Sequence, residues 1–160
     1  MRTLPTGLTL AALLAVAGCS SGSGGSANTP TTNPTNNSAA QQTQATAAIT
    51  TTWTTFFHSG TKPAVAKALL QNGSQLGKAI KVAAQVQKSS KIKEDAKVSK
   101  VTFSSPTSAI VTYSLLSHGS TLLPNATGQA VLQDGHWKVS QATFCTLVSR
   151  GAGNRKVPGC

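Results

Sequence analysis

The chain has 160 residues, a length that suits one domain with a flexible segment and makes two domains unlikely. Fourteen Lys and Arg residues face only three acidic residues, which gives a net charge of +11. This excess favours polyanionic partners through long-range, salt-sensitive attraction. Nucleic acid is excluded as an expected partner, because no nucleic-acid-binding motif occurs and the first residues direct the chain to export.

An export signal is predicted at the N-terminus. Arg2 precedes an apolar run from Leu8 to Ala17, which matches the charged and apolar regions of a secretory signal peptide. The run is too short for a transmembrane helix, which needs roughly 20 apolar residues. Residues 16–19, Val-Ala-Gly-Cys, resemble the lipobox of bacterial lipoproteins. The resemblance implies that residues 1–18 are a lipoprotein signal peptide that is cleaved off.

The lipobox also implies a location and a membrane contact. In lipoproteins the cysteine of this motif, here Cys19, carries a diacylglycerol and becomes the first residue of the mature chain. The expected location is therefore the outer, extracytoplasmic face of the cell membrane, with the membrane as a partner through the lipid on Cys19. In the alternative, an ordinary signal peptide is cleaved nearby and Cys19 is an exposed thiol.

Residues 19–46 are expected to be a flexible linker between the lipid and the folded domain. After Cys19 this segment contains only Ser, Gly, Thr, Asn, Gln, Ala and Pro, so it has no side chains with which to build a core. A coil of this length reaches a few tens of ångströms, at roughly 5 to 6 Å times the square root of the residue number. The folded domain is expected to span residues 47–160.

Three helices are expected at the start of the domain. Apolar residues recur at intervals of three or four, which is the spacing of one helix face. The first helix ends at His58-Ser59-Gly60, the second begins near Pro63, which suits a first helical turn, and the third runs from about Ser74 to Gln87. The apolar stripes are Ile49, Trp53, Phe56 and Phe57; Val65, Leu69 and Leu70; and Leu76, Ile80, Ala83 and Ala84.

From Lys97 onward the pattern indicates β-strands, because β-branched residues become frequent. Strands are expected at 98–103, 109–116, 129–133 and 136–140, with a turn at 104–108 and a longer connection at 117–126. Asp134-Gly135 is a two-residue turn of the kind that closes a hairpin. It pairs Gln133 with His136, Leu132 with Trp137, and Ala130 with Val139. Residues 144–148 are expected to extend or follow the last strand.

Two cysteines remain once Cys19 is assigned to lipid. In an oxidising compartment, a disulfide between Cys145 and Cys160 would close a loop of about 15 residues and contribute on the order of 3 kcal/mol. We therefore expect this disulfide; the alternative is two unpaired thiols. No histidine lies near either cysteine in the sequence, so no metal site is expected there.

The order of these segments resembles the actinobacterial secreted and lipoprotein domains related to the low-molecular-weight antigens of mycobacteria. The matching pieces within residues 49–148 are Trp53 to Phe57, Leu69 to Gly73, Val98 to Phe103, Ala109 to Tyr113, Asp134 to Val139, and Phe144-Cys145. The resemblance implies an α+β fold like that of nuclear transport factor 2, a cone in which N-terminal helices pack on a curved antiparallel sheet of about four strands. It implies this fold and an extracytoplasmic setting, but no reaction.

The sequence offers few groups for catalysis, and neither enzymatic activity nor a cofactor is expected. Enzymes built on this fold use a carboxylate or histidine inside an apolar cavity as a general base. Asp134 is assigned to the hairpin turn, Glu94 and Asp95 to local pairs with Lys91 and Lys97, and His58, His118 and His136 to solvated positions. Tyr113 is a candidate contact for a ligand in the cavity, or else an amphipathic aromatic on a half-buried strand. No nucleophile elbow, phosphate loop or metal-spaced cluster occurs.

Lysines gather in the segment that connects the helices to the strands: Lys88, Lys91, Lys93, Lys97 and Lys100. They are candidate contacts for anionic envelope polymers or lipid headgroups, or else a solvated surface. The sequence as a whole favours a cell-envelope lipoprotein that is a non-enzymatic accessory or binding module for a small apolar ligand or a protein partner. One alternative is a basic tether to anionic polymers or lipids; a second is a small isomerase- or dehydratase-like enzyme with an acid or histidine facing the cavity.

Overall fold

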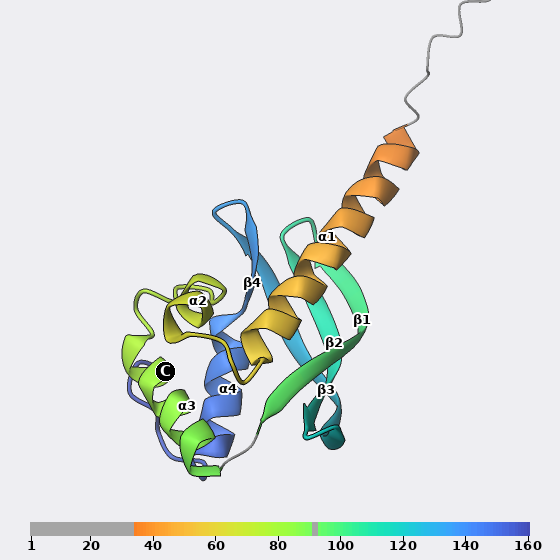
Figure 1. Cartoon of the computed structure of the whole chain (residues 1–160). Coiled ribbons are helices and arrows are strands. Elements are labelled where there is room, and N and C mark those ends of the chain that lie inside the picture. The colour runs from red at the N-terminus through yellow and green to blue at the C-terminus, as the bar shows by residue number, and fades with distance from the viewer. Residues whose placement is uncertain (1–33, 91–92) are drawn as a thin grey trace, which may run out of the picture. The chain divides into compact units, whose positions relative to one another are not determined.

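The computed structural model describes residues 34–90 and 93–160. The predicted signal peptide, Cys19 and the first part of the predicted linker lie outside them. The elements in chain order are α1 (Pro34–Phe57), α2 (Pro63–Ala68), α3 (Gly77–Ser90), β1 (Glu94–Ser105), β2 (Ser108–Ser117), β3 (Ser120–Gln133), β4 (His136–Val139) and α4 (Gln141–Gly151) (Figure 1).

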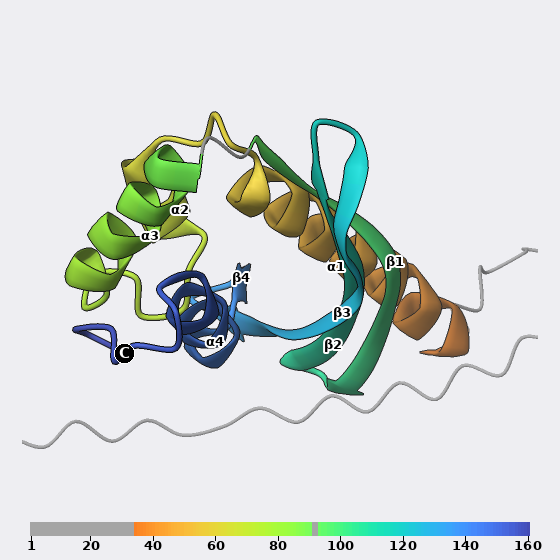
Figure 2. The same cartoon turned by 90° about the horizontal axis from the view of Figure 1, so that it is seen from below.

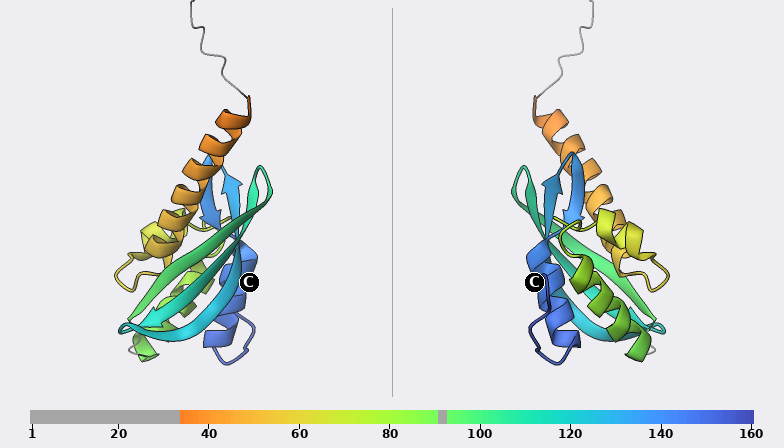
Figure 3. Two further views of the ribbon diagram at one scale, coloured as in Figure 1. Left: turned by 90° about the vertical axis from the view of Figure 1, so that its right-hand side faces the viewer. Right: turned by 90° about the vertical axis from the view of Figure 1, so that its left-hand side faces the viewer.

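The architecture is α+β, as expected, with helices packed on an antiparallel sheet of four strands in the order β1-β2-β3-β4. Helix α1 runs along the sheet and contacts β1 and β4, whereas α2, α3 and α4 gather beside one end of it (Figure 2). The long strands β2 and β3 bend along their length (Figure 3). The expected fold class, helices on a curved sheet of about four strands, is therefore confirmed.

The hairpin of β3 and β4 has the register that its turn predicts. Gln133 pairs with His136, Leu132 with Trp137, and Ala130 with Val139. Asp134 and Gly135 have φ angles of 54° and 75°, the left-handed values that a two-residue turn of this type requires at both positions. The local sequence was therefore sufficient to predict this hairpin.

The expected long connection at 117–126 is instead a second tight hairpin. Strand β2 continues to Ser117 and β3 begins at Ser120, because His118 and Gly119 adopt φ angles of 50° and 80° and turn the chain in two residues. Pro124 is accommodated where the β2–β3 register shifts, close to Leu115, since proline is tolerated in a sheet only at edges and irregularities.

Helix α1 begins at Pro34, so residues 34–46, expected to be part of a flexible linker, are helical in the structure. Most residues of 38–48 are exposed, and Ile49 is the first buried one. The extension is rich in Ala and Gln, which are good helix formers. These residues therefore prolong a helix whose C-terminal part is held by packing.

Residues 141–151 form helix α4 rather than an extension of the last strand. Ser140 is the N-cap, and its hydroxyl accepts a hydrogen bond from the Thr143 backbone N–H at 3.1 Å. Such a cap satisfies an otherwise unpaired donor of the first turn. Phe144 and Val148, one turn apart, are buried against the rest of the domain.

The core lies between α1 and the sheet. Trp53 is fully buried and contacts Tyr113, with ring centroids 5.8 Å apart. Gly128 allows this packing, since a Cβ atom there would lie 2.9 Å from the Trp53 ring and 2.7 Å from the Thr143 methyl group. The end of α2 is fixed to the sheet, because the Val139 N–H donates to the Leu69 carbonyl at 2.9 Å.

Within residues 34–90 and 93–160, none of the helices combines the length and the apolar character that crossing a membrane requires.

Candidate functional site

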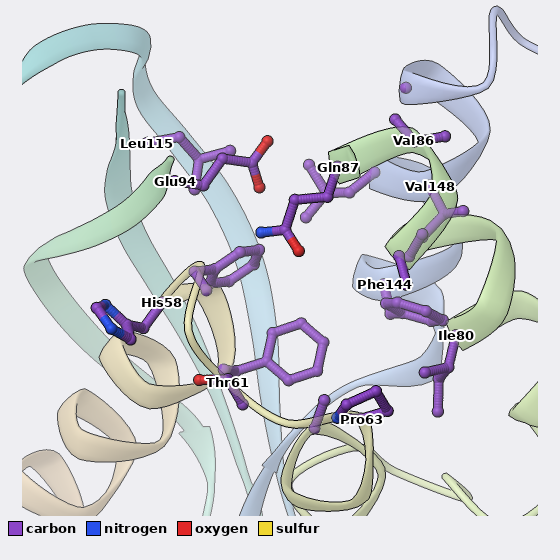
Figure 4. Close-up of a pocket in the computed structure, with 17 residues that line it drawn as sticks. His58, Thr61, Pro63, Ile80, Val86, Gln87, Glu94, Leu115, Phe144 and Val148 are labelled. Atoms are coloured by element: carbon purple, nitrogen blue, oxygen red, sulfur yellow. The ribbon is translucent and has the colours of Figure 1, made fainter. Parts of the chain in front are cut away.

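A cavity of about 210 Å³ lies between the end of α1, the helices α2, α3 and α4, and the adjacent ends of β1 and β2. Its walls are mostly apolar (Figure 4). The main wall residues are Phe56 and Phe57 of α1, Ile80 of α3, Leu115 of β2, and Phe144 and Val148 of α4.

Aromatic contacts and small side chains together shape this cavity. The ring of Phe56 meets those of Phe57 and Phe144 edge to face, at centroid distances of 5.0 and 5.9 Å. Opposite these rings, α3 presents Ala83 and Ala84. Because two alanines occupy positions where larger residues would fill the space, a void remains between α3 and the rings.

Polar groups gather on one side of the cavity. Glu94, the first residue of β1, and Gln87 of α3 point toward each other across its mouth (Figure 4). Burial raises the pKa of the Glu94 carboxyl above its usual value. No described residue forms a hydrogen bond or ion pair with this carboxylate. The fold therefore keeps a partly desolvated carboxylate beside an apolar cavity.

Two further polar residues at the cavity are held by neighbours in the protein. The His58 Nδ1 lies 2.7 Å from the Asp95 Oδ1, and both side chains are more than half exposed. Asp95 is thus paired with His58, and the expected local pair with Lys97 is not formed. The Thr61 hydroxyl donates to the Thr55 carbonyl. Neither His58 nor Thr61 is therefore as available to a ligand as Glu94.

Tyr113, the candidate cavity contact, lies in the core and does not line the cavity. Only 1% of it is exposed, and its ring stacks on Phe57 with centroids 5.4 Å apart. Burial raises the pKa of Tyr113 to about 12, an effect that the positive charge of Arg150 partly opposes. The structure therefore assigns Tyr113 to the packing of the sheet against α1.

Of the candidate polyanion contacts, Lys88, Lys93, Lys97 and Lys100 are exposed, and Lys91 lies outside the described residues. A register shift between Val98 and Lys100 places one extra residue in β1. This bulge explains why the apolar positions run 96, 98, 101 and 103 rather than alternating strictly. As a result, Lys97 and Lys100 lie on the same face of the sheet, opposite the core.

The structure joins Cys145 to Cys160 in a disulfide, with Cα atoms 5.5 Å apart, as expected. His118 and His136 are exposed, and Asp134 contacts Lys138 at 3.4 Å beside the hairpin turn. In the part of the chain that the structure describes, no three His, Cys, Asp or Glu side chains come together in a group suited to a metal ion.

The position of Glu94 beside the cavity was not predicted, although the sequence holds a signal for it. Glu94, Ala96 and Val98 alternate, and Ala96 is buried in the core. Period-two alternation therefore places Glu94 on the inner face of β1. Its assignment to a lysine-rich connector concealed this pattern, because the strand begins three residues earlier than Lys97.

Residues 24–155 match the family model of the low molecular weight antigen MTB12, C-terminal domain. No curated protein and no solved structure matches the chain.

Proposed function

Since its match covers most of the chain, this protein belongs to the family of the MTB12 C-terminal domain, and we propose that it is a lipoprotein that binds a small apolar ligand at the cell envelope. In this proposal Cys19 carries the lipid and the domain lies on the outer face of the cytoplasmic membrane. The domain binds its ligand and catalyses no reaction.

Two features support an exported protein. The apolar run from Leu8 to Ala17 leads directly into Cys19, in the arrangement of a signal peptide followed by a lipidated cysteine. The Cys145–Cys160 disulfide suits an oxidising compartment outside the cytoplasm. The two features are independent, because one lies in the leader and the other in the folded domain.

The apolar cavity is the observation that carries the binding function. An engineered cavity of about 150 Å³ lined by apolar side chains binds benzene, whereas drug-sized ligands occupy about 300 to 1,000 Å³. At about 210 Å³, this cavity suits a small apolar molecule or one end of a longer chain. The absence of catalysis is proposed because Glu94 has no partner among the described residues that would orient it as a base.

Binding is tested with 1-octanol as the probe. We expect saturable binding to the full chain, measured by calorimetry, with NMR shift changes centred on α3 and α4. Ala84→Leu places a larger side chain in the cavity and should abolish this binding. Ala142→Leu makes the same change at an exposed position of α4 and should leave it intact. Equal binding by both variants would place the probe elsewhere and refute the proposal.

Lipidation is tested by labelling cells that express the chain with a radioactive fatty acid. The unaltered chain should incorporate the label and remain with the membrane fraction. Cys19→Ser should lose both properties, whereas the double variant Cys145→Ser/Cys160→Ser should keep them. Membrane retention of unlabelled Cys19→Ser would contradict an anchor at this cysteine.

A second candidate function rests on the basic face of the sheet. The bulge in β1 directs Lys97 and Lys100 to one face, where they would contact anionic envelope polymers or lipid headgroups. Binding to vesicles that contain anionic lipid should then weaken strongly with added salt and with Lys97→Gln/Lys100→Gln. Binding that neither change weakens would remove this candidate.

A further inference from the structure

The cavity of this strongly basic chain is bordered by a carboxylate. Of the three acidic residues in the sequence, Asp134 contacts Lys138 in an exposed hairpin and Asp95 is paired with His58. Glu94 is the third, and no described residue neutralises it. Burial raises the pKa of Glu94, which means that its charge is poorly solvated where it lies. A ligand that compensates this charge would therefore gain from the contact.

The chemistry of a carboxylate restricts what that ligand presents. An ionised carboxylate accepts hydrogen bonds and donates none, and it repels a second anion placed beside it. Hydrogen bonds to such a charged acceptor are roughly twice as strong as neutral ones. Gln87, which faces Glu94 (Figure 4), carries both a donor and an acceptor. Its amide therefore does not reverse the preference of Glu94 for a ligand that donates hydrogen bonds.

We propose that the ligand of this cavity is an apolar molecule whose polar head donates hydrogen bonds to Glu94, either an amine or a hydroxyl, and that anionic heads are disfavoured. This inference rests on the binding function proposed above and adds the chemical class of the ligand. The proposed preference for a donating head group is opposite to the effect of the net charge of +11, which attracts anionic amphiphiles at long range. The contact with Glu94 decides the preference, because exposed charges are screened beyond about 10 Å at 0.1 M salt.

The test compares 1-octylamine, 1-octanol and octanoate as ligands of the full chain at pH 7 and physiological salt. The three probes share one alkyl chain, so differences in dissociation constant report the head group. We expect octylamine to bind about tenfold more tightly than octanoate, or better, since a charged hydrogen bond contributes about 1.5 to 3 kcal/mol and 1.4 kcal/mol is tenfold. If octanol binds as tightly as octylamine, a hydroxyl donor suffices. If octanol binds more weakly than octylamine, the ammonium charge is needed. Either result supports the proposal.

Glu94→Gln identifies the group responsible. This variant keeps the shape of the side chain and removes its charge, so the preference for octylamine over octanoate should fall to about threefold or less. Asp134→Asn is the matched control, because it makes the same charge change at an exposed turn and should keep the preference. The proposal would be overturned if octanoate binds the unaltered chain as tightly as octylamine does. It would also be overturned if Glu94→Gln and Asp134→Asn lose the preference for octylamine to the same extent.

The pH dependence gives a second readout. Among the described residues, Lys93 and Asp95 flank Glu94 in the chain, and Asp95 is paired with His58 at the end of α1. Lys88 and Arg150 lie in the last turns of α3 and α4, the two helices that also line the cavity. Between pH 7 and pH 4, Glu94 takes up a proton while octylamine stays cationic, so octylamine affinity should fall. If octylamine affinity depends on pH in the same way for the unaltered chain and for Glu94→Gln, Glu94 is not the group that binds the head, and the proposal is overturned.

The design separates this inference from the function on which it rests. If all three probes bind with similar affinity and Ala84→Leu abolishes their binding, the cavity function stands and the head-group inference fails. If none of the three probes binds, both are overturned.

Discussion

Removing the Cys145–Cys160 disulfide should destabilise the domain by about 3 kcal/mol. The two cysteines are separated by 15 residues, and closing a loop of that length in the unfolded chain corresponds to about 3 kcal/mol at 25 °C. The tail inside the loop also packs, since Val157 is 3% exposed and Gly159 lies against Gln75 and Ala79. If the unbridged tail frays, the loss of Val157 burial adds about 1.5 kcal/mol.

Urea unfolding of the double variant Cys145→Ser/Cys160→Ser measures this effect without creating free thiols at these positions. The unfolding free energy should fall by about 3 to 4.5 kcal/mol relative to the bridged chain. Val157→Ala in the bridged chain is the control for tail packing and should cost about 1.5 kcal/mol. The reasoning is refuted if the double variant unfolds at the same urea concentration as the bridged chain, or if Val157→Ala costs as much as loss of the bridge.

Three further substitutions test the packing and the electrostatics of the domain. Gly128→Ala should destabilise it by about 1 to 3 kcal/mol in urea unfolding, because the new Cβ would lie 2.7 Å from Thr143 and 2.9 Å from Trp53; an unchanged midpoint would contradict this contact. Gly77→Ala meets no atom within 4 Å and should stabilise the domain by about 0.5 kcal/mol in urea unfolding, because alanine lowers the conformational entropy of the unfolded chain; a lower midpoint would contradict this. Glu94→Gln should raise the melting temperature at pH 7. The pKa of Glu94 is higher in the folded state than its unfolded value of about 4.5, so Glu94 favours folding below that pH and loses this contribution as the pH rises. The gain in melting temperature of Glu94→Gln should therefore vanish in acid. A gain that does not depend on pH would refute burial of Glu94 as its cause.

The parts of the fold that could be predicted are those decided by neighbours in the chain. Asp134-Gly135 predicted both the turn and the register of β3 with β4. His118-Gly119 adopts the same left-handed conformation, but Pro124 nearby suggested a loop, and the second hairpin was missed. Residues 144–148 were expected to extend or follow the last strand and are helical instead. A short apolar run suits a strand as well as a helix, and the cap at Ser140 favours the helix.

The candidate site was predicted only in part. An apolar cavity between helices and sheet was expected, and Phe56 and Phe57 from the apolar stripe of α1 line it. Tyr113 was a candidate cavity contact, because strand periodicity shows which face a residue occupies but not whether Phe57 lies between it and the cavity. The pair of His58 with Asp95 joins residues 37 apart in the sequence. Sequence spacing alone carries no information on such a contact.

By itself, then, the sequence determined the Asp134-Gly135 turn, the helix stripes, the pairing of Cys145 with Cys160 and the family, because each depends on local spacing or on composition. The tertiary structure decided where α1 begins, which carboxylate borders the cavity and that the Glu94 carboxylate forms no hydrogen bond or ion pair with the described residues. These features arise when segments distant in the chain pack together. Burial then changes the pKa of a group such as Glu94, which sequence spacing does not reveal.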